Sequence, residues 1–446
     1  MVKLKPYPKY KDSGIQWIGE IPEGWGIKKI KFISSRISDG DWVEFKDQVE
    51  EGDYKLIQLK NVGIDQIKND TDKEITKDFF RKNNCTKIRE GDLLIARIPH
   101  PVLRATVFSK KFGDCITVVD VAIITPKDIV ESRYLSYFLN SDYSKSIGDS
   151  LTTGATRQRI TRDNIENMLF FFPNLIEEQK DIVNFLDKKT AKIDTLIEKD
   201  KKLIALLKER RTALINHAVT KGLDPNAKLK DSGVEWVGEI PKEWEVRKLK
   251  FVSEKITTGK TPPSENHGYY DNGEINWFTP GDMGKEFILK KSARKITSLA
   301  LLENKTIKYQ PKTVLLVGIG ATLGKVGMIT DIGTSNQQIN AIQFDESEIN
   351  PEYGLYYLYG YKNAIISLSN TSTIGIFNQT QTANFFIIIP PKEEQQKIVD
   401  YLDKATSKID KTIQKIEQKI KLLEEYKKSL IHHVVTGKVD VRGVEA

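Results

Sequence analysis

One short segment resembles a phosphate-binding loop, and few other residues are spaced for catalysis. In Gly318-Ile319-Gly320-Ala321-Thr322-Leu323-Gly324-Lys325-Val326 the glycine spacing is wrong for such a loop, and Val326 stands where a magnesium-binding Ser or Thr is needed. Thr261-Pro262-Pro263-Ser264 lacks the leading Asn or Asp and the trailing aromatic residue of amino-methyltransferases. His432 and His433 are adjacent and point apart on a helix, and the other three histidines lack metal-ligand spacing. We therefore expect no catalytic residue and no metal site on this chain.

Several loops instead combine the residue types that contact DNA. Arg and Lys hold phosphates, whereas Arg, Asn, Gln, Ser and Thr meet base edges. The candidates in the first half of the chain are Arg97, His100, Arg104, Arg157, Gln158 and Arg159. Those in the second half are Lys260, Asn266, His267, Tyr269, Thr322, Lys325, Asn378, Gln379 and Gln381. Each loop alone is also consistent with a solvated turn, but their recurrence at corresponding places in both halves favours a DNA-binding function.

The elements that must position these loops are duplicated. The segment Lys11 to Pro22 returns as Lys230 to Pro241, 219 residues later, and Glu177 to His217 returns as Glu393 to His433. This period is too long for a solenoid of short repeats, so two whole domains were copied. The loops between the repeated anchors differ, as expected for two domains that bind different targets.

The repeat predicts the order of parts along the chain. Each half begins with a short hook, continues as a mixed domain and ends in a long helix. Each mixed domain contains an amphipathic helix, around Tyr134 to Ile147 and Tyr353 to Ile366. The expected parts are an N-terminal hook at 1–25, a mixed domain at 26–175, a long helix at 176–218, a linker and second hook at 219–244, a mixed domain at 245–391, a long helix at 392–435 and a tail at 436–446.

Each long helix has a hydrophobic seam that requires a partner. In the first helix the seam comprises Ile182, Leu186, Ile193, Leu196, Leu203, Leu207 and Leu214. In the second it comprises Ile398, Leu402, Ile409, Ile416, Leu423 and Leu430. The simplest cover for one seam is the other, in an antiparallel pair, although the copy alone does not exclude a parallel one. Acidic residues open both helices and histidines close them, as the helix dipole favours.

The link between the halves is too short to return along the first helix. Glu177 to His217 gives a helix about 60 Å long, whereas the 11 residues from Thr220 to Lys230 reach only about 35–40 Å when extended. We therefore expect an α+β protein in which two mixed α/β domains are separated by a long antiparallel two-helix coiled coil. Internal pseudo-two-fold symmetry follows from the copy.

The composition favours a reducing cellular compartment but does not identify a binding partner. The formal net charge of +8 permits a polyanionic partner but does not require one. Two cysteines, Cys85 and Cys115, disfavour a disulfide framework or a four-thiolate zinc site and fit a reducing compartment. The first residues lack the apolar core of a signal peptide. We expect a cytoplasmic location.

The repeated helical motif resembles the conserved regions of specificity subunits of type I restriction-modification enzymes. Its first copy, Ile182-Val183-Asn184-Phe185-Leu186-Asp187, returns as Ile398-Val399-Asp400-Tyr401-Leu402-Asp403, and each copy follows Glu-Glu-Gln. The Trp-x-Gly-Glu-Ile-Pro hooks and the openings Asp39-Gly40-Asp41-Trp42 and Gly259-x-Thr261-Pro262 also look like that family's target recognition domains. The resemblance covers nearly the whole chain.

The resemblance implies a non-catalytic subunit that reads DNA sequence. Each mixed domain would read one half of an asymmetric bipartite target, and the helices would fix the spacer. The partners would be double-stranded DNA, two modification subunits and, where they join, two restriction subunits. S-adenosylmethionine, ATP and magnesium would reside on those partners, with no cofactor on this chain. The alternatives are a coiled-coil adaptor without sequence readout and a specificity subunit of a type IIB-like system.

Overall fold

The computed structural model describes residues 4–68, 73–98, 101–152, 158–284, 287–369 and 375–444. The chain divides into two compact units. Unit 1 comprises Met1–Asp200 together with Glu417–Ala446, and unit 2 comprises Lys201–Ile416. Unit 1 is therefore discontinuous in sequence. The long helices α6 (Ile176–Lys221) and α11 (Lys392–Val435) each contribute one segment to each unit.

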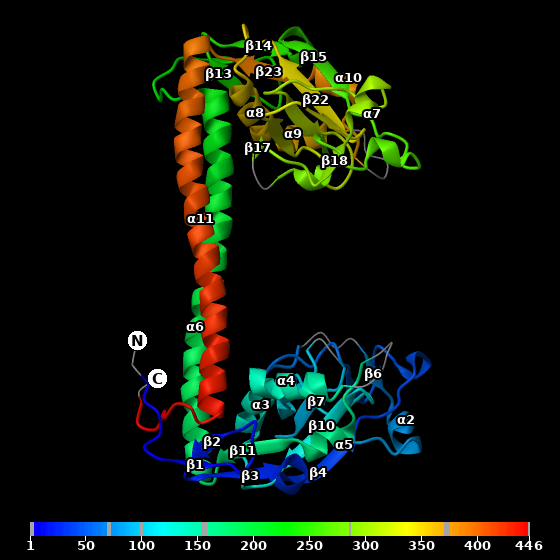
Figure 1. Ribbon diagram of the computed structural model, residues 1–446, viewed down its shortest axis with the longest axis vertical. Helices are drawn as coiled ribbons and strands as arrows, with labels where there is room; N and C mark the ends of the chain where they lie inside the picture. The colour runs from blue at the N-terminus through cyan, green and yellow to red at the C-terminus, as the bar shows by residue number, and fades with distance from the viewer. Residues whose placement is uncertain are drawn as a thin grey trace. The chain divides into compact units, whose positions relative to one another are not determined.

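Unit 1 contains a mixed domain built from short strands and helices (Figure 1). Its strands are β1 (Tyr10–Asp12), β2 (Glu20–Pro22), β3 (Trp25–Lys29), β4 (Ser34–Asp39), β5 (Tyr54–Ile57), β6 (Glu74–Ile75), β7 (Leu93–Ala96), β8 (Ala105–Val107), β9 (Cys115–Thr117), β10 (Val121–Pro126) and β11 (Leu169–Pro173). Its short helices are α1 (Ile30–Ile33), α2 (Lys77–Lys82), α3 (Ser132–Asn140), α4 (Asp142–Ser150) and α5 (Arg162–Asn167).

The central sheet of unit 1 has the strand order β4-β10-β7-β8 and is antiparallel throughout. The apolar run of β7 is fully buried because the strand lies between two neighbours and is covered on both faces. A second sheet, β6-β5-β9, includes a parallel pair, and β3 pairs with β11 where the domain begins and ends. This topology brings the ends of β4 and β7 to the same edge of the central sheet as the start of β10.

Unit 2 repeats this plan with its own elements. Its strands are β12 (Leu229–Asp231), β13 (Glu239–Pro241), β14 (Glu245–Lys248), β15 (Ser253–Thr258), β16 (Ile275–Phe278), β17 (Ile288–Leu289), β18 (Arg294–Ile296), β19 (Val314–Val317), β20 (Val326–Ile329), β21 (Gly333–Ser335), β22 (Ile339–Phe344) and β23 (Phe386–Ile389). Its short helices are α7 (Ser298–Leu302), α8 (Pro351–Gly360), α9 (Lys362–Ser367) and α10 (Gln379–Asn384).

The sheets of unit 2 match those of unit 1 strand for strand, apart from the added edge strand β17. The central order β15-β22-β19-β20-β17 corresponds to β4-β10-β7-β8, and β18-β16-β21 corresponds to β6-β5-β9. The expected duplication of a mixed domain is therefore confirmed at the level of topology.

The single amphipathic helix expected at 134–147 is two helices. Ser141 breaks it, because its backbone is extended and its hydroxyl accepts a hydrogen bond from the Ser144 amide as the N-cap of α4. The expected helix at 353–366 is likewise divided, into α8 and α9, at Tyr361. Helical periodicity continues across both breaks, so the apolar pattern alone did not reveal them.

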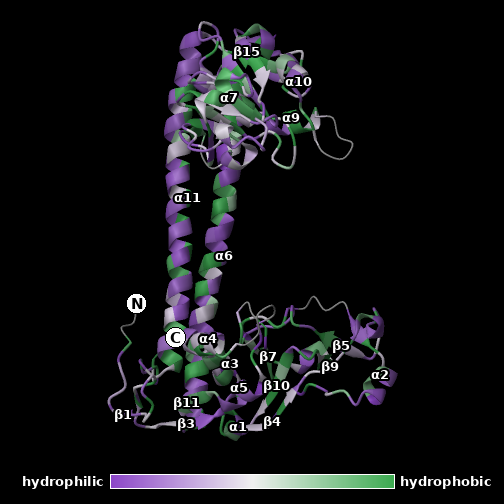
Figure 2. Ribbon diagram, turned by 45° about the vertical axis from the view of Figure 1, so that its right-hand side comes forward, coloured by the Kyte–Doolittle hydropathy of each residue, from purple (hydrophilic) through white to green (hydrophobic). Residues whose placement is uncertain are grey.

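Within each unit, α6 and α11 pack against each other in antiparallel fashion. In unit 1, Asp194 pairs with Lys427 at 2.7 Å and Asp200 with Lys419 at 2.9 Å. Residue numbers therefore increase along α6 in the direction in which they decrease along α11. In unit 2, Arg211 pairs with Asp410 at 3.0 Å, and Ile215 shares a core with Leu402. Figure 2 shows hydrophobic residues recurring among hydrophilic ones along both helices. The observed range of α11 coincides with the predicted one, whereas α6 continues three residues past 218.

The seam of α6 differs from the predicted one at its centre. Ile182, Leu186 and Ile193 are buried, and Leu207 and Leu214 are half-buried. Leu196 and Leu203 are each 43% exposed, because the packed stripe passes through the neighbouring residues Ile197 and Ile204. The predicted seam of α11 is buried or half-buried at every position: Ile398, Leu402, Ile409, Ile416, Leu423 and Leu430.

The repeated Glu-Glu-Gln motif attaches each mixed domain to its helix. Buried Gln179 accepts a hydrogen bond from the Glu131 amide and donates to the carbonyls of Ile129 and Pro173. Gln395 makes the matching set in unit 2, with the Asn350 amide and the carbonyls of Glu348 and Pro390. The preceding glutamates, Glu178 and Glu394, accept from the indole N–H of Trp25 and Trp244, respectively. The motif is thus a structural joint.

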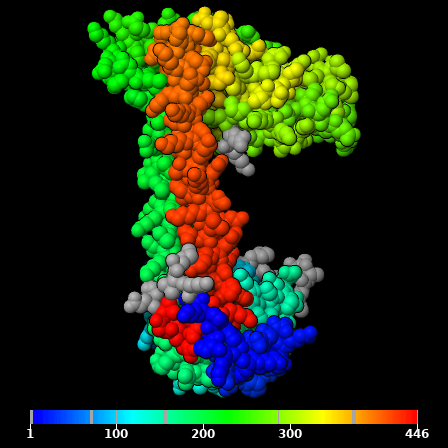
Figure 3. All heavy atoms as spheres, turned by 60° about the vertical axis from the view of Figure 1, so that its left-hand side comes forward, coloured from blue at the N-terminus to red at the C-terminus, as the bar shows by residue number. Residues whose placement is uncertain are grey.

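The two ends of the described chain meet in unit 1. The Asp440 amide donates to the Lys5 carbonyl at 2.7 Å, and the Tyr10 hydroxyl donates to the Gly437 carbonyl at 3.0 Å. Figure 3 shows the N-terminal segment in blue against the C-terminal segment in red. Leu430, Val434 and Val435 of α11 belong to the same core as Trp25. The C-terminal residues therefore complete the unit that the N-terminal residues begin.

Both cysteines are expected to resist thiol reagents while the chain is folded. Cys85 and Cys115 are buried, and burial raises the pKa of each thiol to about 11. At pH 8 only about one thiol in a thousand would then be ionised. Labelling with Ellman's reagent should be slow in buffer and complete in denaturant. Rapid labelling of the native chain would contradict this burial.

In the part of the chain that the structure describes, no helix is both long enough and apolar enough to cross a membrane.

Candidate nucleic-acid interface

A cluster of charged side chains lies at the loop edge of the central sheet in unit 1. Arg97, directly after β7, forms an ion pair with Asp39 at the end of β4 and donates from Nε to the Ile160 carbonyl at 3.1 Å. Arg159 contributes a contact of 3.6 Å to Asp120 and a hydrogen bond to the Val119 carbonyl. Arg162, at the start of α5, lies 3.7 Å from Asp39. Three arginines and two aspartates therefore converge at one sheet edge.

The exposure of these arginines separates their roles. The Arg97 side chain is 7% exposed, and burial lowers its pKa while Asp39 opposes that shift. Arg97 therefore holds the edge together, with its guanidinium engaged inside the domain, and a contact of Arg97 with DNA stays a prediction. Arg159 and Arg162 are 35% and 48% exposed, so both can reach a phosphate. The predicted residue Gln158 is exposed beside them.

Arg104 also acts within the domain. Its guanidinium donates to the carbonyls of Val62 at 3.1 Å and Pro101 at 2.9 Å, and it is half-buried. Backbone carbonyls thus occupy the donors that a phosphate would need. The predicted contacts His100 and Arg157 lie outside the described residues.

The corresponding edge of unit 2 carries neutral amides and hydroxyls. Thr258, at the end of β15, donates to Asn340 at 2.9 Å, and Asn340 donates to the Phe377 carbonyl and to Thr382. Gln379 donates to the Ile256 carbonyl and lies exposed at the surface. Asn378 and Gln381 form a reciprocal cap at the start of α10. The same topological place therefore holds two different chemistries in the two units.

A shallow groove beside this edge adds basic residues in unit 2. Lys260 and Lys305 line it together with Thr261, Asn304 and Gln337. Thr261 and Gln337 are hydrogen-bonded to each other across the groove. Ammonium groups that can hold phosphates and an amide that can meet a base edge therefore occur together.

The remaining predicted contacts of unit 2 are scattered. Asn266 and His267 are exposed, with the Asn266 side chain accepting from the Gly268 amide. Thr322 is half-buried, and Lys325 donates to the Met283 carbonyl at 3.1 Å. Tyr269 is only 4% exposed and its hydroxyl donates to Glu303, so its side chain packs within unit 2, and its contact with DNA stays a prediction. An aromatic residue in a loop more often packs in a small local core than lies exposed as a contact, and Tyr269 does so.

Sequence reasoning missed several residues of these edges. Asp39 belongs to the Asp39-Gly40-Asp41-Trp42 motif, and Arg162 lies three residues after the candidate Arg159, so both had a signal in the sequence. Nothing in the sequence near Lys305 or Gln337 indicates a binding site, because only the fold brings them close to Lys260 from distant positions in the sequence. No group of three or more His, Cys, Asp and Glu residues suited to a metal ion occurs among the described residues.

The duplicated domain, the paired helices and the polar loop edges define a class of two-domain protein that presents two unlike binding surfaces. The family model for the type I restriction modification DNA specificity domain matches residues 22–206 and again 241–422. The chain therefore belongs to the family of type I restriction-modification specificity subunits and carries two copies of their DNA specificity domain.

Relatives and solved structures agree with this assignment. A putative type I restriction enzyme MjaX specificity subunit from Methanocaldococcus jannaschii is 25% identical, over 99% of this chain and 100% of that protein. The MjaIX specificity subunit of the same organism is 26% identical over 92% of both chains. The HsdS subunit from Thermoanaerobacter tengcongensis has a TM-score of 0.53 at 16% identity, covering 94% of this chain and 98% of that one. A chain from a structure described as the basis of complex assembly and conformational transition of the type I R-M system has a TM-score of 0.69 at 17% identity. The match covers 94% of this chain and 99% of that one.

Proposed function

We propose that each mixed domain reads one half of an asymmetric bipartite DNA target, and that α6 and α11 fix the number of base pairs between the halves. The observation that carries this proposal is the contrast between the two loop edges. One scaffold presents arginines and aspartates in unit 1 and amides, hydroxyls and lysines in unit 2. Two unlike surfaces on one scaffold suit two unlike sequences.

The chain would supply recognition while other subunits supply chemistry. Two modification subunits would bring S-adenosylmethionine and methylate adenine at N6, and restriction subunits would bring ATP and magnesium where they join. The long helices offer apolar side chains for such subunits to cover: Leu196, Leu422 and Tyr426 of unit 1 are 40–56% exposed. The complex would act in the cytoplasm, where its DNA substrate lies.

The test is a domain exchange read by methylation mapping. Cells that express this chain with its modification subunits should carry methylated adenines in one bipartite motif. Replacing residues 26–172 with the first domain of another family member should change one half of that motif and leave the other half and the spacer unchanged. Long-read sequencing detects the methylated adenines directly.

Three outcomes would contradict the proposal. A change in both halves would show that the domains do not read independently. Methylation without sequence preference would favour the coiled-coil adaptor. Methylation of DNA by this chain alone would make it an enzyme. Binding to cognate and scrambled duplexes, compared at one stated salt concentration, provides the control.

A further inference from the structure

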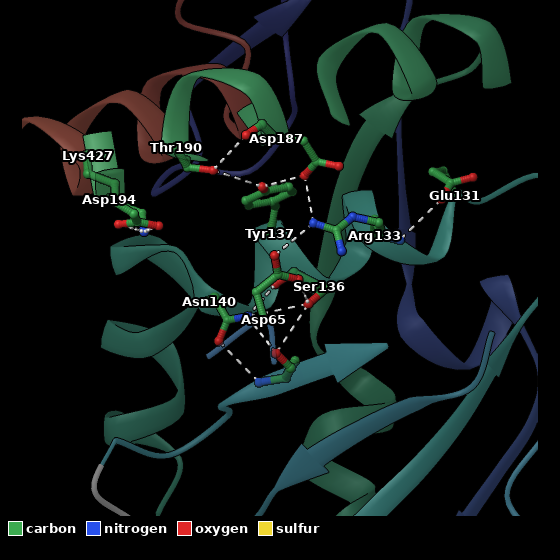
Figure 4. Close-up of polar contacts among 11 residues, drawn as sticks. Asp65, Glu131, Arg133, Ser136, Tyr137, Asn140, Asp187, Thr190, Asp194 and Lys427 are labelled. Carbon is green, nitrogen blue, oxygen red and sulfur yellow. Dashed lines mark hydrogen bonds and ion pairs between the residues drawn. The ribbon is translucent and has the colours of Figure 1, made fainter. Parts of the chain in front are cut away.

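A polar joint links three parts of unit 1: the loop after β5, helix α3 and the start of α6. Figure 4 shows Arg133 of α3 between two carboxylates, Asp65 of the loop and Asp187 of α6. Arg133 Nη2 lies 2.9 Å from Asp65 Oδ2 and 2.6 Å from Asp187 Oδ1. One guanidinium therefore bridges the loop and the long helix.

Neighbouring groups fix both carboxylates. The Tyr137 hydroxyl donates to the same Asp187 oxygen at 2.7 Å, and the Ser136 hydroxyl donates to Asp65 Oδ1 at 3.2 Å. Asp65 has a backbone φ of 54°, a conformation that Asp tolerates better than most residues, and its amide donates to the Ala105 carbonyl. The loop carboxylate is thus held in place by its backbone before it meets Arg133.

Unit 2 makes the corresponding joint with different chemistry. Tyr356 still donates to an aspartate, Asp403, but the position of Arg133 is taken by Glu352. Phe287 packs on Tyr356 and Tyr359 with ring centroids 5.5 and 4.8 Å apart. The guanidinium there comes from α6 itself, because Arg211 lies 4.5 Å over the Phe287 ring. The Tyr–Asp contact is common to both joints, whereas the arginine contacts are specific to each unit.

We infer that Arg133 is a positioning residue that fixes the orientation of the first mixed domain on α6, and thereby narrows the range of half-site separations that the protein accepts. This inference rests on the proposed function. Among the described residues, the Arg133 guanidinium forms its ion pairs with Asp65 and Asp187 and not with the charged residues of the loop edge, so it would act through the loop and α6. Its side chain is 38% exposed, so the joint can loosen without unfolding the domain.

The test compares methylation of duplexes whose half-sites lie at the cognate separation or one base pair closer or further apart. The complex of the full chain with its modification subunits should prefer the cognate separation strongly. In Arg133→Met, methylation at the two altered separations, relative to the cognate one, should rise by about threefold or more. Arg133→Lys, which keeps the charge, should restore part of the preference.

Arg36→Met is the matched control. Arg36 pairs with Asp92 inside the same domain at 2.5 Å, and its other hydrogen bonds to described residues go to Thr125 and Lys87, which lie outside the long helices. It should lower the melting temperature without broadening the separation profile. An unchanged profile in Arg133→Met, or equal broadening in Arg36→Met, would overturn the inference.

A readout that needs no DNA separates this inference from the proposed function. The amides of Gly63, Asp65 and Lys68 are hydrogen-bonded in the native loop. Arg133→Met in the full chain should speed their hydrogen exchange, and so should high salt, which screens exposed ion pairs. The Met328 amide, bonded to the Phe287 carbonyl, should respond less to salt because Arg211 is only 13% exposed. Unchanged exchange in the loop would refute the joint even if no bipartite target were found.

Discussion

Matched four-residue insertions in both long helices are expected to make the complex methylate targets whose halves lie about two base pairs further apart. The insertions belong between Asp200 and Lys201 in α6 and between Ile416 and Glu417 in α11, where unit 1 and unit 2 meet in sequence. Four residues add about 6 Å to each helix, and one base pair occupies about 3.4 Å of duplex. They also leave each packed side chain within about 40° of its original direction. Methylation of a duplex series with graded spacers measures the shift.

Two-residue insertions at the same sites provide the control. They rotate one part of each helix by about 200° relative to the other and direct the seam into solvent. They should abolish activity at every spacer length. If the four-residue insertions left the preferred spacer unchanged, the helices would not determine the separation of the half-sites.

Arg97→Ala is expected to destabilise unit 1 and to abolish recognition of one half-site. The substitution removes the buried partner of Asp39, which keeps only the longer contact with Arg162, and leaves the Ile160 carbonyl without its donor at a buried position. Loss of one member of such a set costs about 2–4 kcal/mol of unfolding free energy. Urea denaturation followed by hydrogen exchange in β4 and β7 measures the loss, and methylation of half-site variants measures recognition.

Arg162→Ala separates stability from DNA contact at the same edge. Arg162 is 48% exposed, reaches Asp39 only at 3.7 Å and pairs with Glu166 of the same helix at 3.0 Å, so its removal should lower the unfolding free energy by less than about 1 kcal/mol. If Arg162 holds a phosphate, affinity should still fall, and the dependence of affinity on salt should weaken. Equal destabilisation by both substitutions would contradict the structural role assigned to Arg97.

Repetition made the architecture predictable from sequence. The copied segments indicate two equivalent domains, and the long apolar periodicity indicates both long helices. The predicted seam differs at its centre because a count in steps of three, four and seven leads from Ile193 to Leu196 and Leu203, whereas the packed stripe continues one residue later. Leu196 and Leu203 are consequently exposed, and Ile197 and Ile204 take the packed positions.

The candidate site was predictable only as a region. Residue type identified the loops that contain Arg97 and Arg159, but it could not separate a buried guanidinium from an exposed one, because that depends on Asp39 and Ile160 from other strands and loops. The bridging role of Arg133 is invisible in sequence for the same reason, since its two carboxylates lie 68 and 54 residues away.

The discontinuity of unit 1 imposes an order on biosynthesis. Unit 2 is one continuous stretch, so all its residues are synthesised before the C-terminal segment of unit 1. Synthesis of unit 1 begins first, but its hydrophobic core, which contains Ile182 and Leu186, is complete only when Leu430, Val434 and Val435 have been added. A nascent chain that stalls before residue 417 therefore exposes an apolar strip that chaperones and proteases can recognise, and only products that include the segment 417–446 can bury it.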